Sequence, residues 1–210
     1  PTGNFGDIFA GYIAKRMGLP VDQLVIATNQ NDILHRTLET GAQVKEGVTP
    51  SISPSMDIQV SSNFERALFE AYGRNGAVVA EQMDELKEKG AFTISQGAID
   101  MLRETFASGR ASEDETYATI KTELMLSGEL LCPHSAVGVT VAGDHLGATP
   151  MITLATAHPA KFPAAVEKAT GQHPELPPHM ADLFERDERV TRVPNDLNAL
   201  QTLIKERIQN

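Results

Sequence analysis

PTGNFGDIFAGYIAKRMGLP, residues 1–20, joins two closely spaced glycines to a run with helical spacing. Apolar and small residues recur along 7–17, and Gly18 and Pro20 end this predicted helix. The next apolar run, LVIAT at 24–28, contains β-branched residues between polar neighbours and predicts a buried strand. A turn, a helix and a strand in this order are typical of an open α/β sheet.

The two glycines of GNFGD, Gly3 and Gly6, carry a chemical prediction of their own. Glycine lets the backbone approach a ligand closely, and the free N–H groups at the start of the following helix point toward the same place. Such an arrangement stabilises an anion, most simply a phosphate. A plain tight turn is the alternative, since the segment is neither a Walker A loop nor a GxGxxG fingerprint.

The composition restricts the classes of function. The 210 residues carry a net charge of −10 and are 41% hydrophobic, which is typical of a globular protein that repels phosphate backbones and anionic lipids. We therefore expect no nucleic-acid and no membrane partner, and the absence of a signal segment favours a cytoplasmic location. The single cysteine, Cys132, excludes an internal disulfide and a CxxC zinc pair, so no metal site is predicted. A structural thiol is favoured over a reactive one.

Helices dominate the predicted middle of the chain. Asp32 is placed to cap a helix that runs to about Thr40. The proline- and serine-rich stretch 47–62 predicts a loop that crosses a surface or a site. Four helices then follow, the last opened by a capping box of Ser112 and Glu115, at about 63–72, 75–89, 95–107 and 112–127.

A second set of elements is predicted toward the C-terminus. The helix that starts near His134 is small and apolar, which suits close packing on a sheet. MITLATA at 151–157 predicts a second buried strand, and Pro159 opens a further helix. Two amphipathic helices are expected last, at about 178–186 and at 195–208 with Asn195 as the cap.

Thr156 would lie at the carboxyl end of the second strand. Ligands in open α/β sheets collect at that edge, so its hydroxyl could reach a bound ring. His158 and Lys161 lie nearby in the sequence and are candidates for catalysis. A structural role is the alternative for all three.

Five segments in order resemble one family. They are PTGNFGDIFAGYIAKRMGLP, LVIATNQNDIL, SPSMDIQVSSNFER, PHSAVGV and LATAHPAKF. Together they resemble the C-terminal part of threonine synthase, a pyridoxal-phosphate enzyme of the tryptophan-synthase-like fold, over essentially the whole chain. The resemblance implies the C-terminal portion of a fold-type II pyridoxal-phosphate enzyme over 1–210. Its α/β fold would have a short, mostly parallel sheet, flanking helices and a helical insertion at 75–130.

The resemblance also implies a cofactor site for pyridoxal 5′-phosphate. Its glycine-rich loop would cradle the cofactor phosphate through backbone N–H groups, and it corresponds here to Gly3, Asn4, Phe5, Gly6 and Asp7. The threonine that hydrogen-bonds the pyridine nitrogen corresponds to Thr156. Further polar residues lie in family motifs without an assigned role, namely Asn29, Asn31, Ser55, Asp57, Ser61, Ser62 and Asn63.

The implied reaction converts O-phospho-L-homoserine and water to L-threonine and phosphate. The lysine that forms the Schiff base belongs to a motif in the N-terminal half of the family, and no segment here matches it. None of the eight lysines lies in a context typical of a buried imine-forming amine. The resemblance therefore implies an inactive fragment whose partner is the missing N-terminal half, and catalytic residues stay unassigned.

Two other functions remain open at the level of sequence. One is another lyase of the same fold, such as a serine or threonine dehydratase, although these generally carry a more glycine-rich phosphate loop. The other is a non-catalytic module that binds a phosphorylated ligand through GNFGD.

Overall fold

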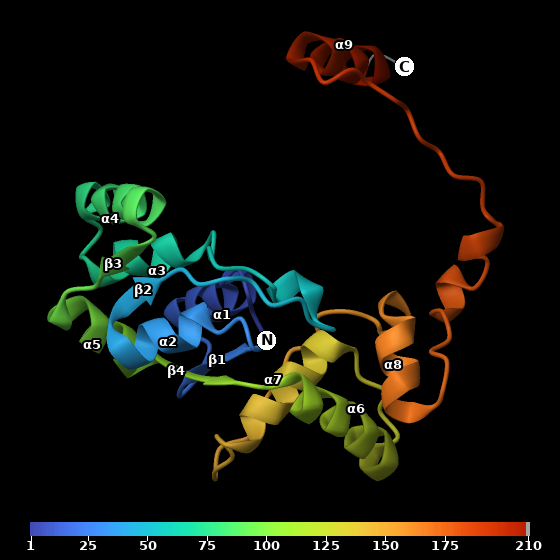
Figure 1. Cartoon of the computed structure of the whole chain (residues 1–210), viewed down its shortest axis with the longest axis horizontal. Coiled ribbons are helices and arrows are strands. Elements are labelled where there is room, and N and C mark those ends of the chain that lie inside the picture. The colour runs from blue at the N-terminus through green and yellow to red at the C-terminus, as the bar shows by residue number, and fades with distance from the viewer. Residues whose placement is uncertain (209–210) are drawn as a thin grey trace. The chain divides into compact units, whose positions relative to one another are not determined.

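The computed structural model describes residues 1–208 and divides the chain into two compact units, Pro1–Glu175 and a second from Leu176 onward (Figure 1). The first unit has two small sheets. In one, β1 (Leu24–Thr28) pairs in parallel with β4 (Phe106–Arg110). In the other, β2 (Ala42–Val44) pairs antiparallel with β3 (Ala91–Thr93).

The first unit also contains eight α-helices. They are α1 (Gly6–Arg16), α2 (Ile33–Thr40), α3 (Phe64–Ala71), α4 (Gly76–Lys89), α5 (Gln96–Thr105), α6 (Glu113–Ser127), α7 (Pro133–Gly143) and α8 (Pro163–Thr170). Figure 1 shows α6 and α7 next to each other, with α8 beside α6. Two short 3₁₀ turns, Pro54–Met56 and Pro159–Lys161, interrupt the connecting segments.

Strand β1 separates two hydrophobic clusters because successive side chains of a strand point to opposite faces. Leu24 and Ile26 belong to the larger cluster, which is built with α2, α3 and α5. Ala27 belongs to the smaller cluster, together with Val137 and Val141 of α7. The predicted buried strand at 24–28 is confirmed, and it forms the middle layer between helices on both faces.

Helix α7 lies very close to this sheet. A Cβ added at Gly109 of β4 would lie 2.7 Å from Cγ1 of Val141, so only glycine fits at this position. The small, apolar sequence of α7 is therefore explained by its packing, as expected. Cys132 caps the helix, since its buried sulfur accepts a hydrogen bond from the Ser135 N–H.

The prediction of a strand at 151–157 is wrong. These residues have no regular secondary structure, and their side chains are half-buried or exposed. Extended backbone becomes a strand only when a neighbouring strand pairs with it, and within residues 1–208 none does so here. Thr156 therefore lies in an irregular segment and not at the end of a strand.

Several predicted boundaries also need correction. The predominantly helical middle of the chain also contains the short strands β3 and β4, which were not predicted, and the helix predicted to reach 107 ends at Thr105. Asp32 does not cap α2, because its carboxylate binds the guanidinium groups of Arg36 and Arg110. The helix expected from Pro159 is a 3₁₀ turn, and α8 begins later. The capping box at the start of α6 is confirmed.

The second unit contains a single α-helix within the described residues, α9 (Leu197–Ile208). Its cap is Asp196, whose carboxylate accepts from the Ala199 N–H at 2.8 Å, and not the predicted Asn195. The helix predicted at 178–186 is wrong: only the 3₁₀ turns Pro178–Met180 and Leu183–Glu185 form there. A helix this short is marginal without packing partners. No helix in residues 1–208 has the length and apolar character needed to span a membrane.

Candidate functional site

Phe5 anchors the GNFGD loop in the protein core. It occupies the left-handed region, with φ of 66°, at the position just before α1. Its ring is fully buried and packs edge-to-face on Phe64 and Phe106, with centroids 5.2 and 5.4 Å away. Such a backbone conformation costs energy for a residue other than glycine, so the buried ring holds a loop that would otherwise relax.

Gly3 lies against the backbone of the 47–62 loop. A Cβ at this position would lie 2.8 Å from the Met56 Cα and 3.1 Å from the Ser55 carbonyl oxygen. The Gly3 carbonyl also accepts a hydrogen bond from the Ser61 hydroxyl. The absence of a side chain at Gly3 therefore lets the two loops meet and form one wall of a site.

The start of α1 keeps unused hydrogen-bond donors. The Asn4 side chain accepts from the Gly6 N–H at 2.8 Å and so occupies that donor. The N–H groups of Asp7 and Ile8, in the first turn, find no acceptor within residues 1–208. Free N–H groups and the positive end of a helix dipole together favour an anion at this position.

Asp57 organises the 47–62 loop at the carboxyl end of β1. Its Oδ1 accepts from Asn29 Nδ2 and Asn31 Nδ2 at 2.8 Å each and from the Ser51 hydroxyl at 2.6 Å. Its Oδ2 accepts from the Ser51 N–H at 2.8 Å. Four donors on one carboxylate fix the loop to the sheet, which assigns a positioning role to the ATNQND and SPSMD segments.

His134 of α7 extends this wall. Its Nε2 accepts from the Ser55 N–H at 3.2 Å, and its ring packs against Phe162 with centroids 4.6 Å apart. Burial lowers the pKa of His134, and the nearby Lys161 ammonium lowers it further against the opposing effect of Asp57. His134 is therefore neutral near pH 7.

Thr156 is held by the residue that follows His134. Its N–H donates to the Ser135 hydroxyl at 3.2 Å, and its own hydroxyl makes no hydrogen bond within the described residues. His158 has the structural role that was the alternative for it, since its Nδ1 accepts from the Ala160 N–H. Lys161 remains exposed, at the edge of the same site.

These segments enclose a cavity of about 150 Å³. The residues that line it come from the chain start, the 47–62 loop, α7 and the segment after it: Pro1, Thr2, Gly3, Asn4, Asp7, Ser55, Met56, His134, Thr156, Ala157, Lys161 and Phe162. Two of the side chains that line the cavity carry a charge, the carboxylate of Asp7 and the ammonium of Lys161. Segments more than 150 positions apart in the sequence thus meet at one small polar site.

The chain is similar in sequence to known threonine synthases. A family model described as "Threonine synthase, C-terminal" matches residues 135–204. A threonine synthase of Pseudomonas aeruginosa is 53% identical over 209 residues, which cover 98% of this chain and 45% of that protein. The chain matches the C-terminal part of threonine synthase.

Solved threonine synthases share the fold. A crystal structure titled as pyridoxal-phosphate-bound threonine synthase from Brucella melitensis has a TM-score of 0.90 and 56% identity over 98% of this chain and 45% of its own. Threonine synthase from yeast has a TM-score of 0.81 and 36% identity over 100% of this chain and 46% of its own. The chain spans about half the length of the threonine synthases it matches. The predicted α/β class, with a short parallel sheet and flanking helices, is confirmed.

Four of the six residues that the threonine synthase resemblance assigned to the cofactor line the cavity: Gly3, Asn4, Asp7 and Thr156. The side chain of Phe5 points into the core, and the Gly6 N–H is occupied by Asn4. No role was predicted from the sequence for His134 or for Thr2, although both residues lie inside segments that resemble threonine synthase. Their neighbours across the cavity are far away in sequence, so only the fold reveals the contact.

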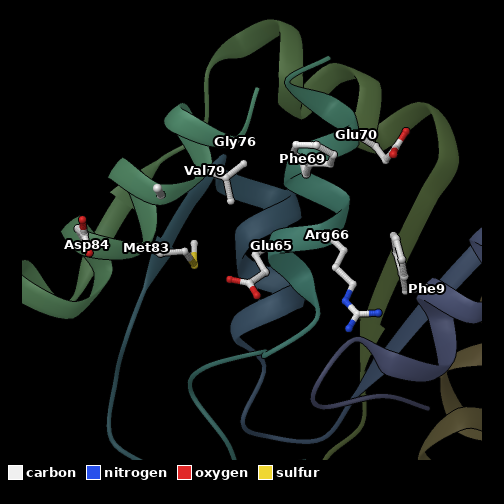
Figure 2. Close-up of a pocket in the computed structure, with 10 residues that line it drawn as sticks. Phe9, Glu65, Arg66, Phe69, Glu70, Gly76, Val79, Met83 and Asp84 are labelled. Atoms are coloured by element: carbon white, nitrogen blue, oxygen red, sulfur yellow. The ribbon is translucent and has the colours of Figure 1, made fainter. Parts of the chain in front are cut away.

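A larger groove of about 610 Å³ lies elsewhere, between α1, α3 and α4. Figure 2 shows Phe9 of α1, Arg66 and Phe69 of α3, and Val79 and Met83 of α4 around it. Three carboxylates also line the groove, those of Glu65, Glu70 and Asp84. An excess of carboxylates disfavours a phosphate, so the smaller cavity is the better candidate for an anionic ligand.

Proposed function

We propose that the chain is the C-terminal part of a threonine synthase, a pyridoxal-phosphate-dependent lyase. The full-length enzyme would convert O-phospho-L-homoserine and water to L-threonine and phosphate. The observation that carries this proposal is the cavity in which the GNFGD loop and Thr156 meet. The similarity to threonine synthases over 98% of the chain supports the substrate and the reaction.

The residues around the cavity fit pyridoxal 5′-phosphate. The donor set consists of the free N–H groups at the start of α1, the Thr156 hydroxyl and the Lys161 ammonium. These groups suit a ligand with a phosphate at one end and a hydrogen-bond acceptor at the other. When bound, the cofactor supplies an electron sink for charge that develops on the substrate.

The roles of the chain's own residues follow from this fit. The Gly3–Asp7 loop would bind the phosphate through its backbone, and the Thr156 hydroxyl would donate to the pyridine nitrogen. A neutral hydroxyl, unlike a carboxylate, leaves this nitrogen less strongly protonated. Ser135 orients Thr156 through the bond to its N–H, and Asp57 keeps the opposing loop in place.

The lysine that binds the cofactor covalently would come from the N-terminal half of the enzyme. None of the eight lysines of the chain is buried, whereas an imine-forming amine needs to be desolvated. Lys161 lines the cavity but is exposed. We therefore propose that the 210 residues alone lack threonine synthase activity and need the N-terminal half as partner.

The proposal is tested by Gly3→Val in the full-length enzyme. The valine side chain would overlap the backbone at Met56 and displace the two loops that form the cavity wall. Affinity for pyridoxal 5′-phosphate, measured by absorbance titration, is expected to fall at least about tenfold. Gly47→Ala is the control, because a Cβ at Gly47 has open space around it. Unchanged affinity of Gly3→Val would place the phosphate site elsewhere and contradict the proposal.

Two further expectations belong to this proposal. The 75–130 segment, expected to be a helical insertion, contains β3 and β4 besides three helices, and we propose that threonine synthases differ most in this segment. The cytoplasmic location stays a prediction.

A further inference from the structure

Two buried polar atoms next to the cavity lack any hydrogen-bond partner. In residues 1–208 five buried side-chain atoms are unpartnered: Thr2 Oγ1, Arg36 Nη2, Gln43 Oε1, Gln82 Oε1 and His134 Nδ1. Thr2 and His134 belong to the lining of the same small cavity, and each is only 5% exposed. A buried polar group without a partner is costly, so both atoms need a partner that the chain does not provide.

The imidazole of His134 carries its proton on the unpartnered nitrogen. Nε2 accepts the hydrogen bond from the Ser55 N–H and must therefore present a lone pair. A neutral ring with a lone pair on Nε2 has its proton on Nδ1. His134 Nδ1 is thus a hydrogen-bond donor, and its missing partner is an acceptor.

The backbone around Thr2 is held by contacts on both sides of the residue. Its N–H donates to the Ala27 carbonyl of β1 at 2.9 Å, and it directly precedes Gly3, whose approach to the 47–62 loop is tight. The Thr2 hydroxyl therefore has little freedom to find another partner in the protein. Like His134 Nδ1, the Thr2 hydroxyl is therefore left without a hydrogen-bond partner from the described residues.

We propose that Thr2 Oγ1 and His134 Nδ1 are ligand-binding donors, each directed at an oxygen of the phosphorylated ligand in this cavity. The inference rests on the proposed function and extends its site by two residues. The Thr2 hydroxyl and His134 Nδ1 can both donate a hydrogen bond, as can the loop N–H groups and Lys161. A phosphate ester offers several oxygens that accept such bonds. In the bound state, the ligand would accept the hydrogen bonds that Thr2 Oγ1 and His134 Nδ1 lack in the free protein.

The first test compares Thr2→Val with Thr2→Ser in the full-length enzyme. Valine keeps the shape of threonine but removes the hydroxyl, so it should raise the unfolding midpoint of the ligand-free protein by about 1–3 °C. It should also weaken binding of pyridoxal 5′-phosphate about tenfold to a hundredfold. Serine keeps the hydroxyl and should retain the affinity to within about threefold. Opposite signs for stability and affinity would not arise from a purely structural hydroxyl.

The second test compares His134→Asn with His134→Gln. The asparagine amide lies where Nδ1 was and can still donate to the ligand, whereas the glutamine amide lies where Nε2 was and can only keep the Ser55 contact. We expect His134→Gln to weaken binding at least about tenfold and His134→Asn to bind more tightly than His134→Gln. The reverse order would show that His134 acts only by holding the loop.

These outcomes separate the inference from the proposed function. If the wild-type enzyme fails to bind pyridoxal 5′-phosphate, the proposed function is wrong. If the wild type binds it, but Thr2→Val and His134→Gln bind equally well, the inference alone is overturned. Inorganic phosphate, titrated separately, shows which variant acts on the phosphate end, since only a donor to phosphate oxygens should change its affinity.

Discussion

Asp57 is the residue on which the loop facing the glycines depends. Its carboxylate accepts four hydrogen bonds, from the side chains of Asn29, Asn31 and Ser51 and from one backbone N–H. A carboxylate can accept all four because it has no proton of its own. The polar residues around it are therefore explained as positioning residues.

Replacing Asp57 with asparagine should disrupt this arrangement. The amide has the same size but turns one acceptor into a donor that faces other donors. We expect the free energy of unfolding, measured with urea, to fall by about 1–3 kcal/mol. Asp144→Asn is the matched control, since Asp144 is exposed and its side chain makes no hydrogen bond within the described residues. Equal stability of the two variants would mean that the network contributes nothing.

His134 predicts a dependence of stability on pH. Burial and Lys161 hold its pKa below the ordinary value of about 6.5, against the opposing effect of Asp57. Because the unfolded chain then binds the proton more readily than the folded one, stability falls as the pH drops below about 6.5. Between pH 7.5 and 5 the free energy of unfolding should therefore fall further for the wild type than for His134→Gln. Equal losses in urea unfolding would remove His134 as a cause.

At the scale of elements, helix α7 is fixed by its contact with strand β4. Gly109 has no space for a side chain beneath Val141. Gly109→Ala should therefore lower the free energy of unfolding by about 1–3 kcal/mol through overpacking. The loss should shrink when Val141→Ala makes room, and this coupling is measured in a double-mutant cycle. A loss of the same size in both backgrounds would show that the contact is not the cause. Gly97→Ala, at an open helical position, is the control.

The sequence predicts those elements whose signals are local. The strand at 24–28 and the capping box at Ser112 were recognised because the deciding residues are adjacent in the chain. MITLATA at 151–157 has the composition of a strand, yet it forms none, because strand formation depends on a partner elsewhere. For β4 the reverse holds: FASGR has a weak strand pattern, but pairing with β1 stabilises it.

The same distinction applies to the site. The resemblance located the GNFGD loop and Thr156 from their motifs, and the fold brings Gly3, Asn4, Asp7 and Thr156 to one cavity. That Thr2 Oγ1 and His134 Nδ1 are buried without a hydrogen-bond partner could not be predicted from the sequence, because it depends on which groups surround each atom in space.

At the scale of the whole molecule, the chain provides one wall of the proposed cofactor site and has no buried lysine. The 210 residues mixed with pyridoxal 5′-phosphate should therefore give no lysine adduct after borohydride reduction, as measured by mass spectrometry. The full-length enzyme treated in the same way is the positive control. An adduct at Lys161, the lysine that lines the cavity, would contradict the proposed division of roles between the two halves.

The crystal structure of the full-length protein with bound pyridoxal 5′-phosphate tests the central claim most directly. We predict phosphate density at the Gly3–Asp7 loop, with the Thr156 hydroxyl within hydrogen-bond distance of the pyridine nitrogen and the Thr2 and His134 donors facing ligand oxygens. A cofactor whose phosphate lies away from this loop would contradict the account.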